Sequence, residues 1–309
     1  MRPTPTEIRI PLRGPAGEPV DLWRTLMSHG FHDLAPMDLD TGARTLALTL
    51  RVPRGRPRRV AVRARSPRAA SVTILGPAPS TAAVAAIERQ IRTVLHLDHD
   101  LSGFYEIAAT DPELAWTISG GGRMLRSPTV FEDVIKTLCT TNCSWALTRT
   151  MVQALVTNLG DAPVGVRDPL ANAFPTPAAM AEQDERFYRD VVRSGYRAPH
   201  FVKLAAAVAS GDLDLEALSD GSRDVVTDEE VERELLALPG IGPYAAAHVM
   251  MTLGRNSKLI LDSWTRPTYK RLSGATRQPT DAQIARRFRR YGDEAGLAFW
   301  LFVTSDWVA

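Results

Sequence analysis

The residues best suited to chemistry surround a short glycine-containing turn between two predicted helices. The turn is Leu-Pro-Gly-Ile-Gly at positions 238–242, and Pro243 stands where the next helix would begin. Glycine tolerates positive φ, so we expect Gly240 and Gly242 to form a tight turn in that conformation. The next helix, which Gly254 ends, would point the free N–H groups of its first turn outward. Such a helix N-terminus binds anions, phosphate above all. Glycines that serve helix packing alone are the alternative interpretation.

A carboxylate follows this hairpin at a characteristic distance. The run Lys-Leu-Ile-Leu-Asp at positions 258–262 ends about twenty residues after the glycine turn. Together the two features resemble the helix-hairpin-helix (HhH-GPD) superfamily of DNA glycosylases, over roughly residues 127–307. The resemblance implies that Asp262 is the catalytic carboxylate, which would stabilise the positive charge that develops on the sugar. Capping of the next helix is a compatible second role. Because Pro267 disfavours a helix running straight on from Asp262, we expect that helix to begin near Thr265.

Three further segments resemble the branch that contains the 8-oxoguanine glycosylases and 3-methyladenine DNA glycosylase II. Arg123–Trp145 is similar to the start of that branch's helical core. Within it, Thr140-Thr-Asn142 resembles the segment that fills the gap left by an extruded base. Gly195-Tyr-Arg197 resembles the element whose arginine contacts the unpaired opposite base. The resemblance thus implies a set of DNA-binding residues: Leu238, Gly240, Ile241, Gly242, Asn142 and Arg197.

A pocket for an extruded base should have aromatic or apolar walls. Tyr244 and His248 lie four residues apart, on one helix face, at positions that line the pocket in the family. Core packing is the alternative for His248. Trp264 and Phe299 complete the predicted base pocket. Relatives that also cut the DNA backbone carry lysine where this chain has Tyr244, and 8-oxoguanine enzymes carry glutamine at the place of Phe299. We therefore predict a monofunctional enzyme that removes an alkylated purine, since aromatic walls favour cationic bases.

Other functions stay open on the sequence alone. A bifunctional oxidised-base glycosylase with lyase activity would need a lysine, and Lys258 is the candidate nearest the site in sequence. A non-catalytic DNA-damage-binding protein would keep the scaffold without base release. A general helical DNA-binding module would bind intact and damaged duplexes equally. The predicted partner of the glycosylase is double-stranded DNA containing a damaged base. This duplex would bind at the hairpin, with the damaged base beside Asp262.

The spacing of apolar residues differs between the first part of the chain and the rest. Alternating apolar residues, as in Ile8–Leu12 and Leu46–Leu50, predict antiparallel strands in the first part. From Ser80 on, helical spacing dominates, and capping boxes mark helix starts at three positions, namely Thr129, Thr227 and Thr280. Within the helical part, we expect Trp145 to lie in the core.

The expected fold class is therefore α+β. We predict a small N-terminal antiparallel β-sheet domain, β-rich and TBP-like, with a connecting helix over residues 1–120. A mainly α-helical HhH-GPD glycosylase core would follow over residues 121–309, with the hairpin at 235–254. A basic segment spans residues 51–68: a run between strands, Arg51–Arg59, is followed by Arg63, Arg65 and Arg68. The segment suits either contact with a phosphate backbone or a solvated loop on a polar strand face.

Composition limits the remaining possibilities. The chain has 309 residues, a net charge of +2 and two cysteines, Cys139 and Cys143. Two thiols are too few for a disulfide framework or an iron–sulfur cluster, so we expect buried apolar cysteines and no metal. No cofactor is expected, apart from a monovalent cation that the hairpin can bind. No stretch is apolar enough for a membrane span or a secretory signal. We expect a monomeric cytoplasmic protein, nucleoid-associated if bacterial, without membrane contact.

Overall fold

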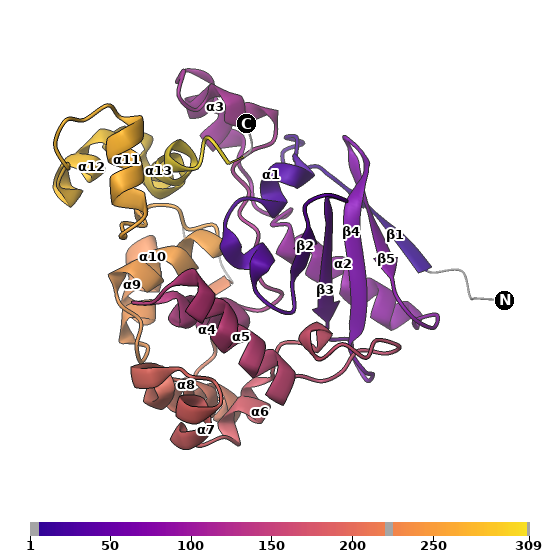
Figure 1. Cartoon of the computed structure of the whole chain (residues 1–309). Helices are drawn as coiled ribbons and strands as arrows, with labels where there is room; N and C mark the ends of the chain where they lie inside the picture. The colour runs from indigo at the N-terminus through magenta and orange to yellow at the C-terminus, as the bar shows by residue number, and fades with distance from the viewer. Residues whose placement is uncertain (1–5, 220–224, 308–309) are drawn as a thin grey trace.

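The computed structural model describes residues 6–219 and 225–307 and combines one antiparallel sheet with a large helical part (Figure 1). The sheet has the strand order β1-β5-β4-β3-β2. Its strands are β1 (Thr6–Pro11), β2 (Asp38–Asp40), β3 (Thr45–Leu50), β4 (Arg58–Ser66) and β5 (Ala69–Ile74). Every neighbouring pair is antiparallel, which confirms the predicted sheet.

Alternation along the strands gives the sheet one apolar face. Leu46, Leu48 and Leu50 of β3 are buried with Ile87 and Ile91 of α2 (Thr81–Val94). Figure 1 shows α2 lying across this face. The Ser80 side chain caps α2 by accepting a hydrogen bond from the Ala83 N–H at 3.2 Å, as residues of this type do at helix starts.

The helical part has two hydrophobic cores. The first is built mainly by α4 (Val130–Thr140), α5 (Trp145–Leu159), α8 (Ala198–Ser210), α9 (Asp228–Ala237) and α10 (Pro243–Thr252). The second contains α3 (Ser102–Ala109), α11 (Thr265–Leu272), α12 (Asp281–Phe288) and α13 (Ala295–Val303). Short helices complete the chain: α1 (Leu22–Leu26), α6 (Pro177–Ala181) and α7 (Glu185–Asp190). The predicted α+β class is confirmed.

Two of the three predicted capping boxes are complete. Thr227 and Thr280 each exchange hydrogen bonds with the residue three positions on, at the starts of α9 and α12. The prediction of a full box at Thr129 was wrong. Its hydroxyl accepts from the Glu132 N–H, but the Glu132 carboxylate pairs with Lys136 at 2.6 Å instead. Both members of that pair are buried, so the ion pair outcompetes the reciprocal cap.

The N-terminal part reaches into the helical part at two places. Phe31, from the turn between α1 and β2, is fully buried in the first helical core. Arg51, at the end of β3, donates to the Phe174 carbonyl at 3.0 Å and pairs with Asp161 at 2.6 Å. The beginning of the basic segment thus ties the sheet to the loop after α5, which is neither of the two roles predicted for it. The division into domains at residue 120 stays a prediction.

None of the helices within the described residues combines the length and the apolar character needed to cross a bilayer.

Candidate active site

A cavity of about 1070 Å³ lies where the N-terminal part meets both helical cores. Its walls come from the turn at residues 29–33, the connection between α4 and α5, the α9–α10 hairpin, the segment 261–266 and the end of the chain. Seven of the residues predicted for the site line it: Asn142, Gly240, Gly242, Tyr244, His248, Asp262 and Trp264. Sequence segments far apart thus converge on one site.

The hairpin has the expected form at one glycine only. Gly240 has a φ of +80°, and a Cβ built there would lie 2.8 Å from the His200 ring. Gly242 is the N-cap of α10 with a φ of −104°, so the prediction of positive φ was wrong for it. A Cβ at Gly242 would meet no atom within 4 Å. The protein itself therefore has room for a side chain at Gly242, and only an external ligand approaching the backbone would need that space.

The side chains of Leu238 and Ile241 are turned into the protein. They are 8% and 5% exposed and pack in the first helical core. Only their backbone is suited to a phosphate contact. The start of α10 has Pro243 at its first position and no side-chain cap, so N–H groups of its first turn lack an intrahelical partner.

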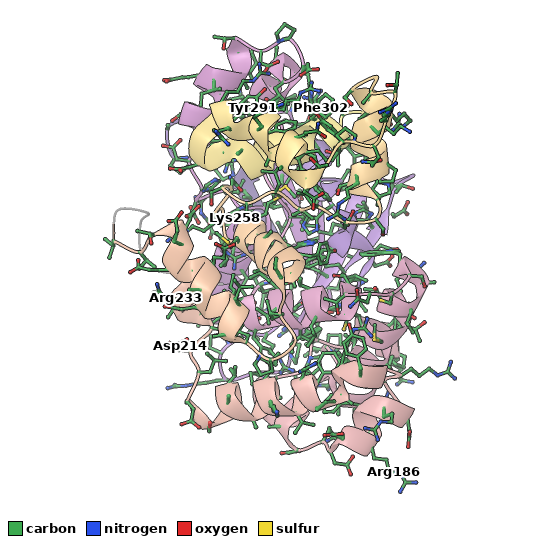
Figure 2. The ribbon with its side chains drawn as sticks, turned by 90° about the vertical axis from the view of Figure 1, so that its left-hand side faces the viewer. Arg186, Asp214, Arg233, Lys258, Tyr291 and Phe302 are labelled. Carbon is green, nitrogen blue, oxygen red and sulfur yellow. The ribbon has the colours of Figure 1, made fainter. Side chains whose placement is uncertain are left out.

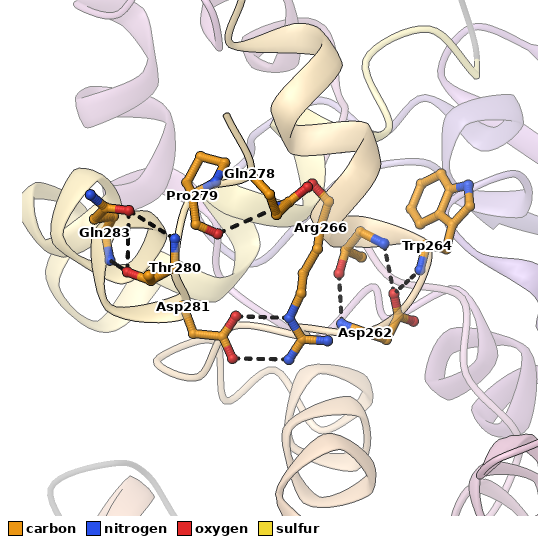
Figure 3. A network of polar contacts seen from close by, with 9 residues as sticks. Asp262, Trp264, Arg266, Gln278, Pro279, Thr280, Asp281 and Gln283 are labelled. Carbon is orange, nitrogen blue, oxygen red and sulfur yellow. Dashed lines mark hydrogen bonds and ion pairs between the residues drawn. The ribbon is translucent and has the colours of Figure 1, made fainter. Parts of the chain in front are cut away.

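Asp262 is held rigidly at the start of α11 (Figure 3). Its Oδ1 accepts hydrogen bonds from the N–H groups of Trp264 at 2.8 Å and Thr265 at 2.6 Å. In return, the Thr265 hydroxyl accepts from the Asp262 N–H at 2.8 Å. The helix begins at Thr265, as predicted from Pro267. Both bonds to the carboxylate end on Oδ1, so Oδ2 can serve a substrate.

Arg266, which also lines the cavity, has a fixed position. Its Nε and Nη2 donate to the two carboxylate oxygens of Asp281 at 2.8 and 2.9 Å. Figure 3 shows this pair bridging the starts of α11 and α12. The guanidinium thus places one positive group at the cavity wall beside Asp262.

Asp262 acts electrostatically on both predicted residues of α10. Burial raises the pKa of the Tyr244 phenol, and the negative charge of Asp262 raises it further. Burial lowers the pKa of His248 to about 4, against the opposing effect of the same carboxylate. The two rings stand edge to face with centroids 6.1 Å apart. A neutral tyrosine and a neutral histidine therefore face the carboxylate at pH 7.

The wall behind His248 comes from residues that the sequence reasoning missed. The rings of Phe31 and His248 stack with centroids 5.3 Å apart, and His29 lies 5.4 Å from His248. Both missed residues belong to the turn after α1, more than two hundred positions before α10. The cluster of ring side chains at positions 29–32 was the available signal, but nothing local placed it near the hairpin.

The segment 140–142, predicted to fill the gap left by an extruded base, contacts an exposed tyrosine. Asn142 has a φ of +44°, and its Nδ2 donates to the Tyr196 hydroxyl at 3.1 Å. The same hydroxyl lies 3.1 Å from Thr141 Oγ1. Tyr196 is 54% exposed and lines the cavity. It was missed, although it stands next to the predicted Arg197.

The prediction that Arg197 reaches the opposite base does not fit its position. The side chain is 3% exposed, and its Nε donates to the Leu138 carbonyl and the Thr141 hydroxyl, each at 3.1 Å. These contacts hold the end of α4 in place. Arg197 thus positions the segment 140–142, and Tyr196 presents its side chain to the outside.

We compared the chain with known protein families, sequences and structures. No protein-family model matches the sequence. A DNA-3-methyladenine glycosylase of Bacillus subtilis is 25% identical over 202 residues, which is 64% of this chain and 65% of that protein. The chain thus matches just under two thirds of that relative's length.

Solved structures match over nearly the whole chain. The 3-methyladenine DNA-glycosylase from Archaeoglobus fulgidus has a TM-score of 0.70 at 23% identity, covering 96% of this chain and 98% of that one. The 8-oxoguanine glycosylase/lyase of Clostridium acetobutylicum has a TM-score of 0.66 at 17% identity, covering 89% and 93%. The chain has the helix-hairpin-helix DNA glycosylase fold. The sequence-based recognition of this fold is confirmed.

The prediction of Phe299 as a residue of the base pocket was wrong. Phe299 is fully buried in the second helical core, against Tyr269 and Phe288. Trp300 faces the cavity instead, and its ring lies 6.0 Å from that of Trp264. One position along a helix turns a side chain by about 100°, which explains the error.

Trp145 was also predicted wrongly, as a core residue. It is 39% exposed and lines the cavity, with its Nε1 donating to Asp33 at 2.8 Å. Cys139 is buried as predicted, and burial raises the pKa of its thiol to about 12. The same prediction was wrong for Cys143, which is only half-buried and lines the cavity. No set of three or more His, Cys, Asp or Glu side chains within residues 6–219 and 225–307 is arranged to hold a metal ion.

The lysines of this glycosylase fold lie away from the cavity. All four are in the described part of the chain, and none lines the cavity there. Lys258, the candidate for lyase chemistry, pairs with Glu232 of α9 at 2.6 Å. Figure 2 shows it beside the hairpin helices. Lys136 is fully buried in its pair with Glu132.

Proposed function

We propose that this protein is a monofunctional DNA N-glycosylase, which extrudes a damaged base from double-stranded DNA and removes it to leave an abasic site. The observation that carries the proposal is the convergence of Asp262, the α9–α10 hairpin and an aromatic wall on one cavity. A cavity of about 1070 Å³ has room for a base and its sugar.

The chemistry follows from the position of the carboxylate. The C1′–N bond breaks with its electron pair going to the departing base, and positive charge develops on the sugar. Asp262 stabilises that charge through the oxygen that its two backbone hydrogen bonds leave available. Water then adds at C1′ and gives its proton to the Asp262 carboxylate, which passes it on to solvent. The backbone at Gly242 and the start of α10 hold a flanking phosphate.

Absence of lyase chemistry follows from the residue types at the cavity. A lyase needs an amine that attacks the sugar and forms an imine. Tyr244 occupies the place where related lyases carry lysine, and Lys258 is engaged with Glu232. The proposed product is therefore an intact strand with an abasic site, which breaks only on later treatment with alkali.

An alkylated purine is the proposed substrate. The cavity walls include the rings of Tyr244, His248, Trp264 and Trp300, and aromatic faces attract the positive charge of an alkylated base. The relatives named for 3-methyladenine agree with this choice. We propose that the protein acts as a monomer, since the cavity is formed within one chain.

The test measures release of free base from end-labelled duplexes, each with one alkylated, oxidised or deaminated base. We expect release from alkylated purines only, with strand cleavage solely after alkali. Strand cleavage without alkali would contradict the proposal and indicate a lyase that uses a lysine. Tight binding of a lesion without any base release, across the whole panel, would identify a damage-binding protein instead.

A further inference from the structure

The turn after α1 contributes a polar group to the base cavity. His29 is 1% exposed and lines the cavity together with His248. The two rings meet edge to face with centroids 5.4 Å apart, and Phe31 packs against both. His29 therefore occupies the inner wall, where the edge of an extruded base would arrive.

The hydrogen-bond partner of His29 defines its tautomer. Its Nε2 contacts the carbonyl oxygen of Leu125. A carbonyl oxygen only accepts, so Nε2 carries the proton and Nδ1 presents a lone pair. Among the described residues, Nδ1 of His29 and Nδ1 of His248 have no hydrogen-bond partner, although both atoms are buried. A buried acceptor without a donor is costly, and a ligand that supplies the donor recovers this cost.

Both imidazoles are neutral at physiological pH. Burial lowers the pKa of His29 well below its usual value, and His248 and Lys136 lower it further. Burial likewise lowers the pKa of His248 to about 4. The cavity wall thus offers an acceptor without bringing a positive charge against a cationic base.

We propose that His29 is a specificity-determining residue, whose Nδ1 accepts a hydrogen bond from the exocyclic amino group of an extruded purine. The inference rests on the proposed glycosylase function and narrows its substrate to alkylated adenines. An oxo group at the same place would set its oxygen lone pairs against that of Nδ1. A site built to accept a hydrogen bond discriminates strongly against a base that lacks the donor.

The test compares two free bases, 3-methyladenine and 3-methylhypoxanthine, which differ in the exocyclic group at C6 and in the ring proton that accompanies the oxo group. Binding to the full chain is followed by tryptophan fluorescence, since Trp264 and Trp300 line the cavity. We expect 3-methyladenine to bind about ten-fold more tightly. Equal affinities, or no binding of either base, would overturn the role of His29.

Two variants locate the preference. His29→Gln keeps a donor for the Leu125 carbonyl and loses the acceptor at Nδ1, so the preference should vanish. His29→Asn places an amide oxygen near the position of Nδ1, so part of the preference should return. Retention of the full ratio in His29→Gln contradicts the inference, and near-ultraviolet circular dichroism checks that each variant is folded.

Base release from DNA separates this inference from the proposed function. A wild-type protein that prefers free 3-methyladenine but releases no base keeps the role of His29 and loses the glycosylase activity. A protein that releases alkylated adenine and its oxo counterpart equally, with His29→Gln unchanged, keeps the activity and loses the role of His29.

Discussion

Asp262 and Thr265 hydrogen-bond each other in both directions. The Asp262 carboxylate accepts from the Thr265 N–H at 2.6 Å, and the Thr265 hydroxyl accepts from the Asp262 N–H at 2.8 Å. The first contact satisfies the N–H of the first residue of α11, so the residue that begins the helix also orients the carboxylate at the cavity wall. The start of the helix thus depends on the hydrogen-bond acceptor of the Asp262 side chain, and the proposed catalysis depends on its negative charge.

This separation predicts the behaviour of Asp262→Asn. The amide oxygen can still accept from Trp264 and Thr265, so the free energy of unfolding should change by less than about 1 kcal/mol. The negative charge is lost, so single-turnover base release should fall by about 100-fold or more. Asp184→Asn is the control, because the Asp184 carboxylate likewise accepts from the backbone N–H three residues on, that of Phe187 at 2.8 Å, and does not line the cavity. Equal activity in the two variants would remove Asp262 from the mechanism.

The two hairpin glycines should respond differently to alanine. Gly240→Ala puts a methyl group 2.8 Å from His200 at a φ of +80°, which should cost about 2 kcal/mol of stability. Gly242→Ala meets no atom within 4 Å, so its cost should stay below about 1 kcal/mol. Its methyl group would stand in the path of a phosphate. Urea unfolding and duplex binding at several salt concentrations should show Gly242→Ala as the variant that is stable but binds DNA weakly. Undiminished DNA binding by Gly242→Ala would contradict the hairpin's role.

The fold was predictable where its signals are local. Thr227 and Thr280 begin helices through contacts within three residues, and Asp262 stands at a recognisable distance from the hairpin. The box at Thr129 failed because Glu132 has a buried partner one helical turn further on, Lys136. Sequence alone does not rank a cap against an ion pair whose burial depends on the tertiary structure.

The site was less predictable, because its residues depend on direction and on distant contacts. Phe299 and Trp300 are adjacent, yet only Trp300 faces the cavity, and an ungapped comparison does not resolve one helical position. Arg197 and Tyr196 are adjacent in the same way, yet Arg197 is buried and Tyr196 is exposed. His29 reaches the cavity only because the N-terminal part packs on the helical core, and no periodic pattern indicates that contact.

Tyr244 should be the reason that no covalent intermediate forms. Borohydride treatment of the wild-type protein with an abasic duplex should trap no adduct. Tyr244→Lys places an amine beside Asp262, where it can attack C1′ and form an imine that borohydride reduces. We therefore expect a trapped adduct in this variant. Lys258→Gln is the control and should behave as the wild type. A wild-type adduct that disappears in Lys258→Gln would establish the lyase alternative.

Arg197 and Tyr196 should separate stability from DNA binding. Arg197→Ala removes a buried guanidinium that donates to the Leu138 carbonyl and the Thr141 hydroxyl, and hydrogen bonds from a charged group are worth more than neutral ones, so stability should fall by about 2 kcal/mol. Tyr196→Ala removes an exposed ring and should cost less than about 1 kcal/mol. Binding to a duplex with an abasic-site analogue should nevertheless weaken in Tyr196→Ala, because that ring stands beside Asn142 at the cavity. Unchanged affinity in Tyr196→Ala would show that the gap is filled by other groups.

His248 should make stability depend on pH. Its pKa is about 4 in the folded protein against an ordinary value of 6.5, with burial as the main cause. The unfolded chain therefore binds more protons between these values, so the contribution is fully present above pH 6.5 and is lost as the pH falls toward 4. For one such group the loss between pH 7.5 and pH 5 is about 2 kcal/mol.

The measurement compares urea unfolding of the wild type and His248→Gln at both pH values. His29, whose pKa is also lowered, and Asp133, whose pKa burial raises to about 6, remain in both proteins. Because both groups are present in both proteins, their contributions largely cancel when the stability of the variant is subtracted from that of the wild type. We expect the variant to lose less stability on acidification, by about the 2 kcal/mol assigned to His248. A difference that stays constant from pH 7.5 to pH 5 would mean that His248 titrates alike in the folded and unfolded chains, and the wall of the cavity would then be wetter than its burial indicates.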